Sequence, residues 1–282
     1  MGCVNSPATP PPVLLACAHG TRDPRGQHAV AALVAAVRDR LPGTRVVDTW
    51  VDVQEPDLEA RTAEVAEHEA VVVPLLLSAG YHVFVDMTRA VAGSPRHRVA
   101  AALGPDPRLA AVLARRLAEA LDAAGAPPLT ARDRVVMVAA GSSDPRAGQD
   151  CERMAQLLSA ELERPVSAAY LSAAAPSLPD ALAAARAEIA RRGAASAPAS
   201  RTRTDTPSAP LGAVPGSGDR PDDAAGRVLL APYLLAPGYF HGRVLAAAAD
   251  VAAQPLLVAD GEVPPELVDL VVEHYREAAA SA

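Results

Sequence analysis

The chain has 282 residues, half of them hydrophobic but only 3% aromatic, which is enough for two domains with cores of alanine, valine and leucine. Its net charge of −7 argues against a nucleic-acid partner. All 26 basic residues are arginine, which excludes a Walker phosphate loop and Schiff-base or pyridoxal-phosphate chemistry, because these need a lysine amine. No apolar run reaches the ~18 residues of a membrane span, so no membrane partner is expected.

The three cysteines, Cys3, Cys17 and Cys151, are odd in number and lie far apart in the sequence. Neither a disulfide framework nor a Cys-x-x-Cys metal site follows from this spacing. A reducing cytoplasm is the simpler location for such a chain.

The first half of the chain alternates short strand-like runs with longer helical ones. Residues 1–12 are rich in proline and are expected to be disordered, and residues 13–125 form a first lobe. The predicted strands and helices are, in order, 13–18, 26–41, 45–53, 57–69, 71–77, 82–92, 98–103 and 107–124. This alternation is typical of a parallel sheet covered by helices.

The second half resumes the pattern after a proline-containing boundary and forms a second lobe over residues 131–282. Its predicted elements are 134–140, 147–163, 165–171, 178–192, 227–235 and 264–281. Residues 193–226 lack a periodic apolar face and are predicted to be a disordered insertion. The fold class is therefore α/β, with two small parallel sheets flanked by helices and a cleft between the two lobes.

The second lobe repeats the first. The run Ala18–Arg25 matches Ala139–Arg146 at a shift of 121 residues, and Pro74–Tyr81 matches Pro232–Tyr239 at a shift of 158. Between them, Glu55-Pro56-Asp57-Leu58 matches Ala175-Pro176-Ser177-Leu178 at a shift of 120. The order of the matches is kept, so the longer last shift marks the insertion in the second copy.

Comparison of the two copies separates residues of the scaffold from candidates for chemistry. The shared glycines, prolines and Asp23 indicate turns and caps that each lobe needs. Four polar positions are not repeated: His19 becomes Ala140, Asp52 becomes Ser172, His82 becomes Phe240 and Asp86 becomes Val244. These four positions are therefore the first candidates for a functional site.

His19 and His82 each follow a strand-like apolar run and precede a helix. Both imidazoles are expected at the carboxyl-terminal edge of one parallel sheet, where open α/β sheets bind ligands. Two neutral imidazoles at this edge suit a borderline divalent metal ion better than a hard one. The alternative is a purely structural role for His19, in which its imidazole forms a hydrogen bond within its own turn.

Three further residues could support this pair. Asp86 follows His82 at the (i, i+4) spacing of one helix face, where it could orient the imidazole or accept a proton. Asp52 lies within the second predicted strand, between Val51 and Val53, and could sit at the edge of the cleft or merely flank the loop. His241 stands next to Phe240 and could face the cleft from the second lobe. The remaining histidines, His28, His68, His97 and His274, are expected to face solvent.

Several arginines lie near predicted strand ends or helix starts and could together bind an anionic ligand. They are Arg22, Arg25, Arg89, Arg146 and Arg243. Each of them taken singly is more often a surface charge.

The two histidine motifs together resemble the CbiX/SirB family of sirohydrochlorin chelatases. The residues that carry the resemblance are Ala18-His19-Gly20-Thr21-Arg22-Asp23-Pro24, then 74–83 and Asp86-Met87. The resemblance implies a long form made of two fused lobes, hence a monomer with an internal pseudo-dimer. It also implies ATP-independent insertion of Fe²⁺ or Co²⁺ into sirohydrochlorin, for sirohaem or cobalamin synthesis, with no permanently bound cofactor.

In the family's pattern, His19 and His82 would present the metal, and Asp52 stands where similar sequences often have glutamate. The chemistry agrees with the residues, because histidine can accept a pyrrole proton near neutral pH and arginines can bind the carboxylates of the tetrapyrrole. Two alternatives stay open. One is a non-catalytic protein that binds or delivers metal, and the other is a hydrolase like the histidine phosphatases, which usually have arginine where Ala18 stands.

Overall fold

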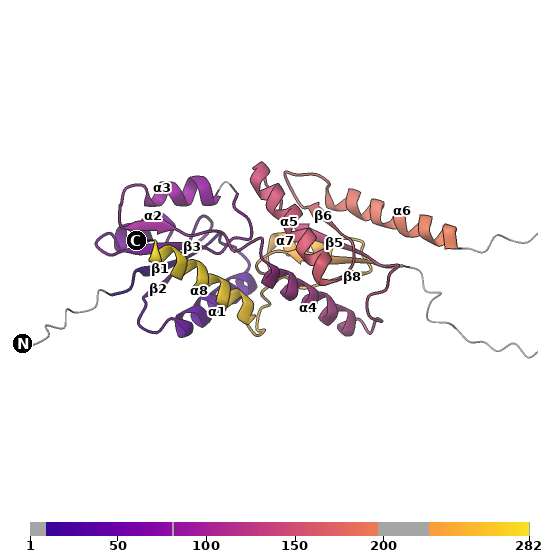
Figure 1. The fold of residues 1–282 in the computed structure, drawn as a ribbon, viewed down its shortest axis with the longest axis horizontal. Helices are drawn as coiled ribbons and strands as arrows, with labels where there is room; N and C mark the ends of the chain where they lie inside the picture. The colour runs from indigo at the N-terminus through magenta and orange to yellow at the C-terminus, as the bar shows by residue number, and fades with distance from the viewer. Residues whose placement is uncertain (1–9, 81, 197–225, 282) are drawn as a thin grey trace, which may run out of the picture.

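The computed structural model describes residues 10–80, 82–196 and 226–281, and for residues 82–84 and 196 it describes the backbone alone. The disorder predicted for most of residues 1–12 and 193–226 falls outside the described residues. Two parallel sheets, each flanked by helices, lie one beyond the other along the long axis of the molecule (Figure 1). The predicted α/β class with two lobes is confirmed.

The first sheet has the strand order β2-β1-β3-β4. Its strands are β1 (Val13–Ala18), β2 (Val46–Trp50), β3 (Ala70–Pro74) and β4 (His97–Val99). The connecting helices are α1 (Pro24–Arg40), α2 (Leu58–Glu64), the π-helix η1 (His82–Met87) and α3 (Thr88–Val91). Every residue of β1 and β3 is buried, which explains their unbroken apolar sequences.

The second sheet repeats this order as β6-β5-β7-β8. Its strands are β5 (Arg134–Ala139), β6 (Val166–Tyr170), β7 (Val228–Tyr233) and β8 (Val251–Ala252). The helices are α5 (Pro145–Glu161), α6 (Leu178–Ser196) and α7 (Tyr239–Leu245). Ala18 pairs with Trp50 and Ala139 with Tyr170, so the register of the central pair is the same in both sheets.

The two lobes exchange their last helices. Helix α4 (Pro107–Ala123) follows β4 in the chain but packs on α5, β7 and β8 of the second lobe. Helix α8 (Pro265–Ala280) follows β8 but packs on α1 and β3 of the first lobe (Figure 1). Apolar residues of both lobes therefore form one continuous buried cluster.

This exchange corrects the division at residues 13–125 and 131–282 for both helices. Chain order assigns α4 to the first lobe and α8 to the second, whereas each helix buries its apolar face against the other sheet. Tyr275 on α8 reaches the start of the first sheet, where its hydroxyl donates a hydrogen bond to the carbonyl oxygen of Pro12 at 2.6 Å. The amphipathic pattern predicts which face of each helix is buried, but it does not predict which sheet that face covers.

Some elements differ from the sequence predictions in detail. Helix α6 continues to Ser196, so the predicted insertion begins within a helix. The sequence missed the two-residue strand β8 and the short helix α7. His97, expected to face solvent, begins β4 and is only 7% exposed, with Nε2 3.4 Å from the carbonyl oxygen of Val65. Within the described ranges, no helix combines the length and apolarity that crossing a membrane requires.

Candidate functional site

The carboxyl-terminal ends of the central strands of both sheets meet around one cavity of about 840 Å³. Its lining comes from both lobes, and it includes His19 after β1, Leu77 after β3, Ala140 after β5 and Leu234 after β7. The cleft predicted between the lobes is therefore present. Because the sheets are parallel, the turns that follow these strands all open toward this space.

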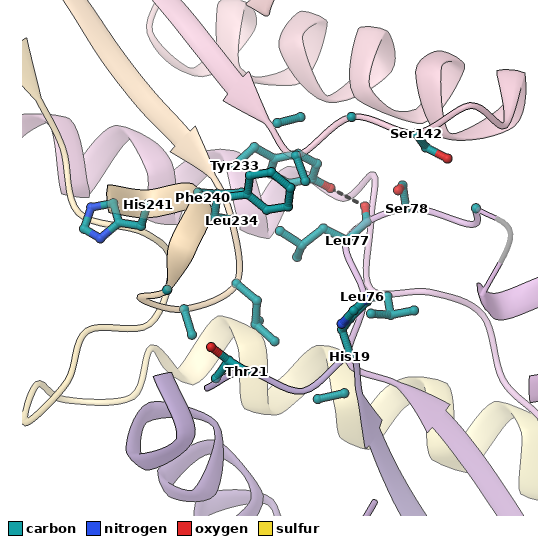
Figure 2. A pocket seen from close by; sticks show the side chains of 18 of the residues that line it. His19, Thr21, Leu76, Leu77, Ser78, Ser142, Tyr233, Leu234, Phe240 and His241 are labelled. Carbon is teal, nitrogen blue, oxygen red and sulfur yellow. Dashed lines mark hydrogen bonds between the residues drawn. The ribbon is translucent and has the colours of Figure 1, made fainter. Parts of the chain in front are cut away.

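Apolar side chains dominate the cavity wall. Leu76 and Leu77 line it from the first lobe, and Tyr233, Leu234 and Phe240 line it from the second (Figure 2). A wall of this kind suits the faces of a flat, largely apolar ring system, while polar groups must meet its edges.

His19 stands at the turn that follows β1, and its exposed side chain lines the cavity beside Leu76 (Figure 2). The backbone sets this turn. The carbonyl oxygen of His19 accepts a hydrogen bond from the Asp52 amide at 3.0 Å, and Gly20 has φ +97°. A Cβ at Gly20 would collide with the carbonyl oxygen of Asp52, so only glycine fits directly after the histidine.

The second lobe makes the same turn without the histidine. Ala140 lines the cavity in place of His19, and its carbonyl oxygen accepts a hydrogen bond from the Ser172 amide at 2.9 Å. Gly141 has φ +90°, and a Cβ there would collide with the carbonyl oxygen of Ser172. The turn therefore does not need an imidazole, which favours a functional rather than a structural role for His19.

The other predicted ligand, His82, is the first residue of η1, and its side chain lies outside the described part of the structure. The chain that leads to it is described, since Ser78 and Gly80 line the cavity. Asp86 lies in the same segment, which is a π-helix rather than the α-helix that the sequence predicted. The pairing of the two imidazoles and the role of Asp86 stay predictions.

Asp52 lies in the loop after β2 rather than in the strand, because β2 ends at Trp50. Its exposed carboxylate accepts a hydrogen bond from the Val53 amide at 2.7 Å, and it is not among the residues that line the cavity. Of its two predicted positions, the structure places Asp52 at the loop, next to His19 through the backbone.

His241 lines the cavity from α7 and is only 5% exposed. Burial lowers the pKa of its imidazole below the ordinary value, so the ring is neutral near pH 7. Its imidazole is turned away from His19, and the two rings lie on different sides of the cavity (Figure 2). The structure thus places His241 on the cavity wall but does not bring it together with His19.

The five candidate arginines separate into different environments. Arg22 is exposed and lines the cavity. Arg25 instead forms two hydrogen bonds with Asp23, at 3.2 and 2.9 Å, and these bonds lower the pKa of that carboxyl. Asp23 also caps α1 by accepting a hydrogen bond from the Arg25 amide at 2.9 Å.

Arg146 repeats the arrangement of Arg25 in the second lobe, where it pairs with the helix cap Asp144 at 2.7 Å. Arg243 donates a hydrogen bond to the carbonyl oxygen of Leu171 at 2.6 Å, and Arg89 is exposed on α3. None of these three lines the cavity within the described structure. Of the five arginines that could together bind an anionic ligand, only Arg22 lines the cavity within the described structure, and its binding to a ligand stays a prediction.

The model of the CbiX family matches residues 13–120 and 134–196. The chain belongs to the CbiX family. The match spans parts of both lobes of this CbiX-family protein, in agreement with the internal repeat. No curated relative matches the sequence at a significant level.

Solved structures confirm the fold of this CbiX-family protein. SirB from Bacillus subtilis with Fe³⁺ is 20% identical, with a TM-score of 0.64 and coverage of 96% of each chain. The sirohydrochlorin chelatase SirB from Bacillus subtilis subspecies spizizenii in complex with cobalt is 16% identical, with the same TM-score and coverage. CbiX described as the terminal enzyme of sirohaem biosynthesis in denitrifying bacteria is 21% identical, with a TM-score of 0.58 and coverage of 94% and 99%.

Sequence reasoning missed the aromatic part of the cavity of this CbiX-family protein. Phe240 was noticed only as the residue that replaces His82, and Tyr233 was not singled out, although it stands where the first lobe has Leu75. Both were visible as departures between the two copies. The signal is the reverse of the one that marks His19: an aromatic residue stands in the second copy where the first has leucine or histidine.

Proposed function

We propose that this protein is an ATP-independent sirohydrochlorin chelatase that inserts Fe²⁺ or Co²⁺ into the tetrapyrrole. One observation supports the proposal most directly. The turns after β1 and β5 have the same backbone and both line the cavity, but only the turn after β1 carries a histidine. Membership of the CbiX family and the folds of SirB and CbiX support the same reaction. The metal ion is a substrate here, so the site has to release it.

In this proposal, His19 and His82 present the metal and accept protons as the pyrrole nitrogens lose them. A neutral imidazole can bind a divalent metal through one nitrogen and leaves neighbouring positions for water or the macrocycle. Histidine also titrates near neutral pH, which suits proton acceptance from a pyrrole N–H. Insertion then requires no other reactant, since the two protons leave as the metal enters.

The apolar wall would receive the faces of the macrocycle, with Leu76 and Leu77 on one side and Tyr233 and Phe240 on the other. Arg22 is placed to bind a substrate carboxylate at the cavity edge. We propose action in the cytoplasm as a monomer, because the internal repeat supplies the second lobe.

The test is an anaerobic metallation assay with purified protein, sirohydrochlorin and Fe²⁺, Co²⁺ or Ni²⁺, followed by the absorbance change of the tetrapyrrole. His19→Ala is expected to lower the initial rate at least about 100-fold, because general-base and metal-binding functions are lost together. The matched control is His68→Ala, which removes an exposed imidazole outside the cavity. Thermal unfolding checks that both variants fold.

Equal rates for His19→Ala and the wild type would remove His19 from the mechanism. Metal binding by the wild type without any insertion would instead indicate a metal-delivery protein. Release of phosphate from phosphomonoesters, with no metallation, would favour the hydrolase that the histidine motif leaves open.

A further inference from the structure

The second lobe holds one segment of the first lobe at the cavity through two hydrogen bonds. The hydroxyl of Tyr233 on β7 donates to the carbonyl oxygen of Leu77 at 2.6 Å (Figure 2). The carboxylate of Asp150 on α5 accepts from the amide of Ala79 at 2.8 Å. Leu77 and Gly80, at the two ends of this segment, both line the cavity. One wall of the cavity is therefore fixed from the opposite lobe.

Both partners are suited to holding a backbone rather than to reacting. Tyr233 is only 3% exposed, and burial raises the pKa of its hydroxyl, so this group remains a proton donor near neutral pH. Asp150 is half-buried on a helix that is capped and regular. A hydrogen bond from an amide to a carboxylate is among the stronger hydrogen bonds in proteins.

The internal repeat shows that these bonds occur on one side only. In the first lobe, Ala29 stands where Asp150 stands in the second, and Leu75 stands where Tyr233 stands. The counterpart of Ala79 is Pro237, which has no amide hydrogen to donate. The chemistry needed for either bond is thus absent from the opposite side of the pseudo-symmetric interface.

The opposite side is held by close packing instead. A Cβ at Gly26 on α1 would collide with the carbonyl oxygen of Pro237, so the helix approaches that segment closely. The equivalent position on α5 is Ala147, whose Cβ lies 3.5 Å from the position of a Cβ at Gly80. Polar anchoring therefore replaces part of this packing where the chain leads to His82.

We propose that Asp150 and Tyr233 are positioning residues that fix segment 77–80 and, through it, the start of the segment that carries His82. This inference rests on the proposed function, because it assigns the anchored segment to the presentation of the metal. The second lobe has no histidine at the positions equivalent to His19 and His82, but in this proposal it still contributes to the site. It supplies the two groups that hold Leu77 and Ala79, shortly before η1 begins.

The experiment compares Asp150→Ala, Asp150→Asn and Tyr233→Phe in the full chain. Asparagine keeps an acceptor oxygen for the Ala79 amide and removes the charge, whereas alanine removes both. Glu152→Ala is the matched control, since it removes an exposed acid from the same helix. Three quantities are measured: hydrogen exchange of the peptide that covers residues 75–80, Co²⁺ affinity by absorption titration, and kcat and KM of metallation.

Asp150→Ala is expected to speed exchange at Ala79 about tenfold and to weaken Co²⁺ binding several-fold, with thermal unfolding little changed. Tyr233→Phe is expected to speed exchange in the same peptide. Asp150→Asn should lie close to the wild type, and Glu152→Ala should equal it.

Unchanged exchange and Co²⁺ affinity in Asp150→Ala would overturn the inference, as would an Asp150→Asn variant as impaired as Asp150→Ala, because charge rather than the hydrogen bond would then be responsible. Faster exchange with unaltered Co²⁺ affinity and metallation would show an anchor without a positioning role, which also overturns it. A wild type that neither binds nor inserts Co²⁺ would refute the proposed function, and exchange alone would then decide whether the segment is anchored by these residues.

Discussion

The two lobes have the same strand order, the same register between their first two strands and the same glycine turns, but they carry different side chains at the cavity between them. The first lobe presents His19 where the second has Ala140. The second presents Tyr233 and Phe240 where the first has Leu75 and His82. At these positions the first lobe therefore has histidines and the second has an alanine and aromatic residues, one of which, Tyr233, also anchors the opposite lobe.

Features that occur in both lobes can be explained by the fold alone. The aspartate cap and its arginine partner occur in both lobes, as Asp23 with Arg25 and Asp144 with Arg146. A pair that both lobes retain stabilises a helix start and needs no ligand to explain it. A histidine that only one of the two turns carries, such as His19, is not explained by the turn itself.

The functional difference between the two turns can be tested by moving the histidine from one to the other. In the double variant His19→Ala/Ala140→His, the imidazole stands at the equivalent turn of the second lobe. We expect metallation to stay at least about 100-fold below the wild-type rate, because Phe240 rather than a second histidine follows the neighbouring strand there. The initial rate of metallation measures this, with Ala140→His alone as the control for cavity crowding. Recovery to within a few-fold would show that either lobe can present the metal.

The exchange of helices predicts that a core mutation in one half of the chain loosens the other. Leu270 on α8 is fully buried, and α8 packs on β3 of the first lobe. Leu270→Ala should lower the free energy of unfolding by about 2–5 kcal/mol and speed hydrogen exchange first in β3. The matched variant is Leu113→Ala on α4, which should speed exchange first in β7. Loosening of β7 by Leu270→Ala would contradict the exchange.

The sequence predicts those strands and helices whose positions depend on local patterns of apolar and capping residues. Buried strands such as β1 and β3 are unbroken apolar runs, and the Asp-Pro cap marks the starts of α1 and α5, so these elements were found within a few residues. The two-residue strand β8 is too short to give a pattern. His97 looked exposed because charged residues surround it, but it begins a strand and is buried.

The candidate site can be predicted from the sequence at positions where the two copies have residues of different chemical types. His19 against Ala140 is such a difference, and His19 lines the cavity, while its role stays a prediction. The sequence shows the charge of Arg25, which makes it a candidate for binding an anionic ligand, but the ion pair of Arg25 with Asp23 depends on side-chain geometry. The contacts of Tyr233 and Asp150 join residues more than 70 positions apart, which periodicity cannot reveal.

The glycine turns of the two lobes should contribute equally to the stability of the fold but unequally to metal binding. Gly20→Ala and Gly141→Ala each place a Cβ against a backbone carbonyl at positive φ. Each should therefore lower the free energy of unfolding by about 2–3 kcal/mol. Thermal unfolding should show similar losses, whereas Co²⁺ affinity should fall only in Gly20→Ala, since only that turn carries a histidine. Equal losses of Co²⁺ affinity would show that the second turn also shapes the metal site.

An ion pair lies at the base of the second sheet and has no counterpart in the first lobe. Asp133 has only 2% of its side chain exposed and pairs with Arg227 at 2.7 Å, where the first lobe has Pro12 and Glu69. Burial alone would raise the pKa of the Asp133 carboxyl, but hydrogen bonds from the Arg227 side chain and from the amides of Thr130 and Arg227 lower it below the ordinary value.

A carboxyl whose pKa is lower in the folded than in the unfolded state stabilises the fold above the unfolded pKa of about 3.9. That contribution is lost as the pH falls from about 4 through the lower folded pKa. Asp133→Asn should therefore cost about 1–2 kcal/mol at pH 7 and progressively less below pH 4. Unfolding curves from pH 2 to pH 7 measure the difference, with the exposed Asp39→Asn as the control. Because the pair ties β5 to β7, hydrogen exchange in acid should rise in the second sheet before the first, and the reverse order would assign the acid sensitivity to other groups.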